Sequence, residues 1–302
     1  MRIKQTEIVE TFAEAFAMVG ARMVITAETA EWALAAGRSV TGFATSIIGC
    51  KCEMGIEATL APADTPDGRP GISVLIFAMN EEGLGKRLVE RIGQCVMTCP
   101  STACYNGLAT EKQVVVGGQL RFFGDRFQIS KLLEGRRLWR IPVMDGEFLV
   151  DDQAGLQPAV GGGNFLILGR DQRSALAAAS AAIAAMNGTP GAIFPFPGGV
   201  VRSGSKPGSR YKFLHASTND AFCPTLRAIA ARTDVPDGVG SVLEIVIDGL
   251  DLEAVETSMR RGIHAAAAAG ALGISAGNYG GGLGQYQLHL HPLLAGSPEA
   301  GS

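Results

Sequence analysis

The chain has 302 residues, of which 47% are hydrophobic and 18% are charged. This composition excludes a disordered or low-complexity protein and allows one large core or two smaller ones. The net charge is −3 and no long basic block occurs, so a nucleic-acid or anionic-membrane binder is not indicated and we expect small molecules or proteins as partners. Apolar stretches are interrupted before about 18 residues, and Met1–Lys4 does not begin a signal peptide, which predicts a cytoplasmic protein.

The first half of the chain alternates strand and helix patterns. Residues 81–97 carry apolar side chains at every fourth position, which is one face of a helix. Residues 28–37 predict a shorter helix that ends at a glycine. Strands are predicted at 22–27, 42–49, 72–78, 119–123 and 138–143.

The second half repeats this element order after an acidic, glycine-bearing stretch at 145–155. We take that stretch as the boundary between two lobes, residues 1–145 and 146–302. The similar order of elements predicts the α/β (α+β) class, with two lobes of similar βαβ-type organisation. The predicted elements are strands at 164–168, 241–247 and 283–290, a helix from the cap Asp171 to Asn187-Gly188, and a helix from the cap Asp251 to Ala269.

Cysteine and histidine positions indicate neither a metal site nor a thiol nucleophile. His289 and His291 share one face of the last predicted strand, but no third ligand lies near them in the sequence. The spacing of the cysteines within residues 95–104 is not that of a zinc site, and no histidine stands in a known catalytic motif with Cys223. We therefore predict six free thiols and no metal.

A glycine-rich basic loop at 197–210 carries Arg202, Lys206 and Arg210. Backbone amides and cations in such a loop can bind an anionic ligand, although composition alone favours a solvated loop. No segment matches a P-loop, a G-x-G-x-x-G fingerprint or a G-x-S-x-G elbow. Nucleotide-dependent chemistry is therefore not indicated.

Glu244 interrupts an apolar run that otherwise reads as a strand covered on both faces. A buried carboxyl group needs a partner or a proton, and burial raises its pKa towards the range of a general acid at neutral pH. A solvent-facing glutamate or a structural ion pair is the more frequent explanation of such a pattern. The polar segments 215–220 and 274–279 flank this strand in the chain and read as walls of a site.

Sequence blocks distributed over nearly the whole chain resemble the formylmethanofuran:tetrahydromethanopterin formyltransferases. The family is known from methanogenic archaea and methylotrophic bacteria, and Arg, with 19 of the 26 basic residues, points to a GC-rich methylotrophic bacterium. Unlike archaeal members, the chain has a longer segment between Pro224 and Asp237 and no surplus of acids. The similar blocks are 11–16, 65–71, 91–98, 162–165, 195–199, 216–221, 244–247, 274–278, 283–286 and 289–291.

The resemblance implies two ferredoxin-like lobes in a homotetramer, with no metal and no prosthetic group. It implies a one-carbon acyltransferase that moves a formyl group between the amine of methanofuran and N5 of tetrahydromethanopterin, in a ternary complex without an acyl-enzyme. Both carriers are then co-substrates. The acid/base glutamate of the family corresponds to Glu244.

From this reaction we expect roles for individual residues of the site. Asn219 and Asn278 are candidate oxyanion donors, alongside backbone amides. The other expected substrate-binding residues are Ser217, Thr218 and, for anionic tails, Lys206, Arg210 and Arg202. Two alternatives stay open: a non-catalytic or partner-dependent subunit of a formyltransferase/hydrolase complex, and a ferredoxin-like ligand-binding or regulatory protein.

Overall fold

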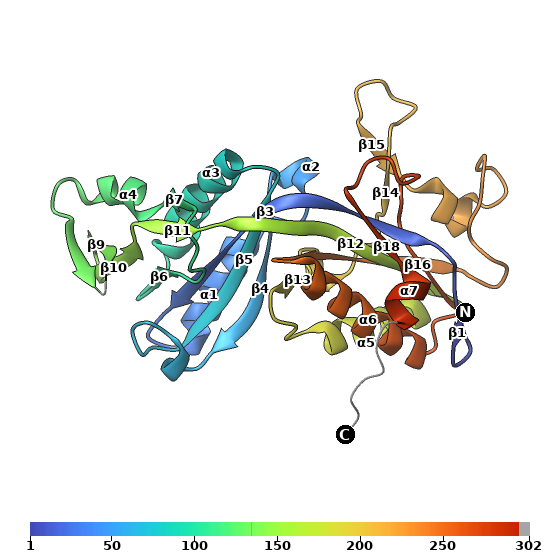
Figure 1. The fold of residues 1–302 in the computed structure, drawn as a ribbon, viewed down its shortest axis with the longest axis horizontal. Coiled ribbons are helices and arrows are strands. Elements are labelled where there is room, and N and C mark those ends of the chain that lie inside the picture. Colours follow the sequence, from blue (N-terminus) through green and yellow to red (C-terminus); the bar gives the residue numbers. More distant parts are fainter. Residues whose placement is uncertain (134, 296–302) are drawn as a thin grey trace.

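A single branched sheet runs the length of the molecule in the computed structural model, which describes residues 1–133 and 135–295 (Figure 1). Its two longest strands, β3 (Phe12–Thr26) and β12 (Gln157–Gly169), pair antiparallel over residues 16–20 and 157–161. The other strands of this sheet are β1 Arg2–Ile3, β2 Thr6–Ile8, β4 Glu53–Leu60, β5 Gly71–Ala78, β6 Ala103–Asn106, β8 Ile129–Leu133, β9 Arg136–Val143, β10 Gly146–Asp151, β13 Ala192–Ile193, β16 Ser241–Gly249, β17 Gly273–Ser275 and β18 Tyr286–His289. Two further pairs form separate two-stranded sheets: β7 Gln113–Val115 with β11 Gln153–Gly155, and β14 Ser205–Pro207 with β15 Ala216–Thr218.

Helices pack against this sheet in two groups, which confirms the predicted mixed α/β class. The first core joins α1 and α3 to strands β3, β4, β5 and β6. The second core joins α5 and α6 to β12, β16 and β17. The α-helices are α1 Ala30–Thr41, α2 Ile47–Cys50, α3 Glu81–Arg91, α4 Gly117–Leu120, α5 Gln172–Met186, α6 Leu252–Ala268 and α7 Leu290–Ala295.

The helix starts in the second half lie where the sequence placed them. The Asp171 side chain accepts from the Ser174 backbone N–H in a capping box, and Asn187 ends α5. The Asp251 side chain accepts from the Ala254 N–H at the start of α6. These caps satisfy N–H groups that have no partner inside the helix.

Three predictions in the first half are wrong. Residues 42–49 do not form a strand, because Ser46 caps the short helix α2 instead. Residues 119–123 lie in α4 and a 3-10 turn, with Phe122 and Phe123 both exposed. The first helix also does not end at Gly37 but packs through it: a β-carbon there would lie 2.0 Å from Cδ1 of Ile72.

The N-terminal strands extend the sheet of the second half. Glu7 and Ile8 of β2 pair in parallel with Gly273 and Ile274 of β17, and β18 pairs with the first residues of β3. The lobe boundary at 145/146 stays a prediction, and residues 296–302 of the predicted second lobe lie outside the described residues. In the described ranges, no helix has the length and apolarity to cross a membrane.

The strand β16 has two different faces. Ile245 and Ile247 pack into the core beneath α5 and α6. The opposite face lies under the segment 200–240, which carries the β14–β15 hairpin on the side of the sheet away from those helices (Figure 1). Glu244 and Asp248 belong to this second face, because side chains alternate along a strand.

A buried pair of carboxyl groups joins the two halves of the sheet. Glu53 at the start of β4 and Asp248 of β16 are almost inaccessible neighbours, and Oδ2 of Asp248 has no hydrogen-bond partner among the described residues unless the two carboxyl groups share a proton. Glu53 also accepts from the Ile47 N–H at 3.0 Å, and Asp248 from the Gly162 N–H at 3.0 Å. Burial, and for Asp248 the neighbouring Glu53 charge, raise the pKa of both groups, so the pair retains a proton.

This pair makes the folded state bind more protons than the unfolded chain above the ordinary carboxyl pKa. The contribution of this pair to the free energy of unfolding should therefore fall as the pH rises above the ordinary carboxyl range. Asp248→Asn supplies the hydrogen bond without a titrating proton, so its free energy of unfolding should fall less with rising pH than that of the parent. Urea unfolding at several pH values measures this, with the exposed Asp237→Asn as control. An equal dependence of the free energy of unfolding on pH in Asp248→Asn and the parent would contradict a proton held by this pair.

Candidate active site

Glu244 sits at the centre of β16 and is held on both sides by backbone hydrogen bonds. It faces Leu166 of β12 in the antiparallel ladder. On its other side, the Val201 N–H donates to the Glu244 carbonyl at 2.7 Å, and the Glu244 N–H donates to the Val201 carbonyl at 2.9 Å. The main chain is thus fixed while the side chain projects towards the segment 200–240.

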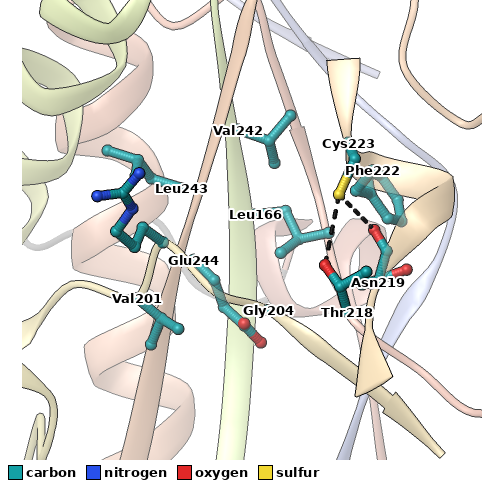
Figure 2. A pocket seen from close by; sticks show the side chains of 11 residues that line it. Leu166, Val201, Gly204, Thr218, Asn219, Phe222, Cys223, Val242, Leu243 and Glu244 are labelled. Atoms are coloured by element: carbon teal, nitrogen blue, oxygen red, sulfur yellow. Dashed lines mark hydrogen bonds between the residues drawn. The ribbon is translucent and has the colours of Figure 1, made fainter. Parts of the chain in front are cut away.

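A pocket opens beside this carboxyl group. Figure 2 shows Glu244 next to Gly204, with Thr218, Asn219 and Cys223 across the pocket. The lining residues are Leu166, Val201, Arg202, Gly204, Thr218, Asn219, Phe222, Cys223, Val242, Leu243 and Glu244. The sequence separately predicted Glu244 and the wall 215–220, and the fold brings them together.

Two glycines lie against the carboxyl oxygens. A β-carbon on Gly204 would stand 3.1 Å from Oε2 of Glu244, and one on Gly277 would stand 3.6 Å from Oε1. The carboxyl group forms no hydrogen bond or ion pair with any residue that the structure describes. Burial therefore acts alone and raises the pKa of Glu244 to about 7. At neutral pH, a large fraction of this group carries a proton.

The loop after β17 forms the wall that contains Gly277. Asn164 of β12 holds this glycine twice: its Oδ1 accepts from the Gly277 N–H at 2.6 Å, and its Nδ2 donates to the Gly277 carbonyl at 3.1 Å. Further along the loop, burial and the negative charges of Glu244 and Glu14 raise the pKa of Tyr279. The phenol therefore stays neutral beside the carboxyl group.

The predicted amide donors occupy different environments. Asn219 lines the pocket, and within the described ranges its side-chain amide has no hydrogen-bond partner. Asn278 instead donates to Oγ1 of Thr11 at 3.1 Å and to the Phe12 carbonyl at 3.2 Å. Asn219 is thus available to a substrate, whereas Asn278 ties the loop to β3.

The other predicted wall residues have local partners. The Ser217 hydroxyl donates to the Gly208 carbonyl at 2.7 Å. Oγ1 of Thr218 lies 3.6 Å from Sγ of Cys223, which also donates to the Asn219 carbonyl at 3.3 Å (Figure 2). The thiol therefore helps to close one corner of the pocket.

The basic residues lie at increasing distance along the hairpin. Arg202 is exposed and lines the pocket. Lys206 of β14 forms an ion pair with Asp220, which lowers the pKa of that aspartate. Arg210 is exposed in the turn between β14 and β15, with no salt bridge to a described residue. The three residues form a basic edge of the hairpin, of which only Arg202 lines the pocket and Lys206 is paired with Asp220.

Glu14 and Asn164 are residues beside the site that the sequence reasoning missed, whereas Tyr279 lies at the end of the predicted wall 274–279. Glu14 stands within an otherwise apolar stretch of β3, and its polarity was the one available signal. Its partners are backbone amides more than 260 residues away. Such contacts leave no pattern in a single sequence.

The structure separates the two histidines of the sequence motif. His289 ends β18, and His291 lies in α7, so the two do not share a strand face as predicted. Among residues 1–133 and 135–295, no three His, Cys, Asp or Glu side chains are placed to hold a metal ion.

Comparisons with known proteins agree along the chain. Residues 1–143 match a family model described as formylmethanofuran-tetrahydromethanopterin formyltransferase, and residues 146–293 match one described as its proximal lobe. The protein of that name from Methylococcus capsulatus is 56% identical over 98% of this chain and all of its own length.

Two solved structures share the fold. The formyltransferase/hydrolase complex from Methylorubrum extorquens with methylofuran contains a chain of 49% identity and TM-score 0.94, with coverage of 97% of this chain and 98% of that one. The formyltransferase from Methanosarcina barkeri gives 48% identity and TM-score 0.92, with coverage of 97% and 100%. The chain therefore belongs to the formylmethanofuran-tetrahydromethanopterin formyltransferases, a family of acyltransferases, as its sequence blocks predicted.

Proposed function

We propose that this chain transfers a formyl group between methanofuran and tetrahydromethanopterin, with Glu244 as the acid and base. Family membership supports the reaction and its two co-substrates. The observation that carries the mechanism is the partner-free carboxyl group between Gly204 and Gly277, with a pKa of about 7. A group with that pKa can both give and take a proton at neutral pH.

The reaction needs a proton on the leaving nitrogen, because an amine anion is a poor leaving group. The acceptor nitrogen attacks the formyl carbon, a C–N bond forms, and the carbonyl electron pair moves to oxygen. Protonated Glu244 gives its proton to the departing nitrogen as the old C–N bond breaks. The carboxylate then takes the proton that the attacking nitrogen loses. Glu244 is thereby regenerated, and no acyl-enzyme or resident cofactor enters the cycle.

Asn219 is the side chain we assign to the oxyanion of the tetrahedral intermediate. It lines the pocket with Glu244, and its amide hydrogens have no partner in the described part of the chain. A fixed donor aimed at developing negative charge stabilises the transition state more than the ground state. We assign Asn278 to shaping the site wall, since both its amide hydrogens are bound.

We assign the anionic tails of the two carriers to the basic edge of the hairpin. Methanofuran carries carboxylates and the pterin side chain carries a phosphate, which suit Lys206, Arg210 and Arg202. Ser217 and Thr218 of β15 lie on the same hairpin as secondary contacts. We further propose a cytoplasmic homotetramer with the lobe division at 145/146.

A second candidate is a subunit that transfers formyl groups only within a larger assembly. The structural relative from Methylorubrum extorquens was solved inside a formyltransferase/hydrolase complex, which favours this reading. The pocket favours the first candidate, because Glu244, Asn219 and both glycines come from one chain.

Glu244→Gln should lower kcat by a factor of about 10² to 10⁴, because the amide keeps the shape of the side chain but carries no transferable proton. Steady-state formyl transfer from formyl-tetrahydromethanopterin to methanofuran measures the loss. Glu253→Gln, an exposed change at the start of α6, should retain the parent rate. An active Glu244→Gln enzyme would remove this residue from the mechanism.

In both directions of the reaction, the dependence of the rate on pH should reflect the protonation of Glu244. With Glu244 protonated in the resting enzyme, kcat/KM should be constant in mild acid and fall as the pH rises through about 7. The residual rate of Glu244→Gln should lack this limb, which separates it from titration of the substrates. A parent profile that is flat well above pH 7 would contradict a protonated resting state.

Lys206→Ala should raise KM for the carrier whose tail it binds by about tenfold and change kcat little, because a contact made equally in ground and transition states affects binding alone. Lys212→Ala, an exposed lysine in the turn of the same hairpin, is the matched control. A large loss of kcat at constant KM would contradict tail binding.

A further inference from the structure

Glu14 is a buried carboxylate on β3 with an unusual set of partners. Its Oε2 accepts from the N–H groups of Tyr279 at 2.5 Å and Gly281 at 3.1 Å. Its Oε1 accepts from those of Leu283 at 2.7 Å and Gly284 at 2.8 Å. Four backbone amides of the loop after β17 therefore converge on one side chain.

These hydrogen bonds make Glu14 the anchor of that loop. Each carboxylate oxygen takes two donors, and the four bonds lower the pKa of Glu14 against the opposing effect of its burial. The loop has left-handed backbone at Gly280 and Gly281 and no regular structure of its own. Without the carboxylate, its inward-facing amides would lose their acceptors, at a cost of the kind that buried unpaired donors carry.

The anchored loop is also the wall against Glu244. The backbone N–H of Glu14 donates to the Gly277 carbonyl at 3.3 Å, and Gly277 lies against Oε1 of Glu244. Tyr279, whose N–H Glu14 accepts, carries its phenol within electrostatic range of Glu244. The side chain of Glu14 thus fixes Tyr279 and the rest of the loop, and its backbone N–H binds Gly277, which lies beside the carboxyl group of Glu244.

We propose that Glu14 is a positioning residue for formyl transfer: by gathering four amides of residues 279–284, it keeps Tyr279 and the adjoining Gly277 in place beside Glu244 and limits the access of water to that carboxyl group. The kinetic part of this inference rests on the proposed function. The structural part, the dependence of the Glu244 environment on Glu14, does not.

Four other titratable or charged side chains lie near Glu244. Arg202 and Cys223 line the same pocket from the segment 200–240, and Tyr279 faces it from the loop. Asp248 lies four residues along β16 and is paired with Glu53. Only Tyr279 among them contacts the side chain of Glu14, through its backbone N–H and not through its phenol.

Glu14→Gln tests the proposal in the full-length protein. One carboxylate oxygen becomes an NH₂ group that faces two N–H donors, so the loop should detach in part and admit water to Glu244. We expect hydrogen exchange of the segment 277–284 to become about tenfold faster or more. In a carbon-13 titration of the glutamate carboxyls, the Glu244 resonance, identified by its loss in Glu244→Gln, should shift from a pKa of about 7 to about 6 or below. The high-pH limb of kcat/KM should move with it.

Glu10→Gln is the matched control, since Glu10 is exposed and close by in the sequence. This variant should leave the hydrogen exchange of the segment 277–284, the pKa of Glu244 and the rate of formyl transfer unchanged. If Glu14→Gln does not fold, Gly281→Ala loosens the same loop from its other side: Gly281 has φ of 74°, and a β-carbon there would lie 2.7 Å from Nε2 of Gln287. The same fall in the Glu244 pKa is expected.

The outcomes separate this inference from the proposed function. Faster hydrogen exchange of the segment 277–284 with an unchanged Glu244 pKa would give Glu14 a structural role alone and overturn the proposal. Unchanged hydrogen exchange of this segment would overturn it as well. A parent protein without formyl transfer would remove the proposed function, whereas exchange and titration would still decide whether Glu14 positions Glu244.

Discussion

The site depends on one constraint: the half-buried carboxyl group of Glu244 has no hydrogen-bond or ion-pair partner among the described residues. Burial of an unpaired carboxylate is unfavourable, so Glu244 responds by holding its proton to a pH near neutrality. Two glycines make this possible, because any side chain at Gly204 or Gly277 would approach the carboxyl oxygens. The resulting space lies beside the carboxyl group and is open to a substrate. A pKa near 7 in that position is the property that our proposed acid and base role for Glu244 requires.

The long central strands assemble this environment from distant parts of the chain. β3 contributes Glu14, β12 contributes Asn164, and β16 contributes Glu244. Glu14 and Asn164 both hold the loop 277–284, which lies beside Glu244. The two ionised or ionisable glutamates have opposite environments. Glu14 has four donors and a lowered pKa, whereas Glu244 has none and a raised pKa. The roles that we propose for them, anchor for Glu14 and proton carrier for Glu244, rest on that difference.

The sequence predicted the parts of this arrangement that are local. Asp171 and Asp251 start their helices because a capping side chain acts within three residues, and Glu244 stands out because an apolar strand surrounds it. Wrong elements arose where packing decides: Gly37 resembles a helix end but allows α1 to touch Ile72. Glu14 escaped notice because its amide partners are remote in the chain. The resemblance of many blocks supplied the reaction, which no single motif indicates.

The central claim is that a pocket built by this one chain is sufficient for formyl transfer. The most direct measurement is transfer between methanofuran and tetrahydromethanopterin by the purified chain, with no other protein added. We expect turnover in proportion to the concentration of this chain. No turnover by the correctly folded chain alone, with activity appearing on addition of hydrolase-complex subunits, would contradict it.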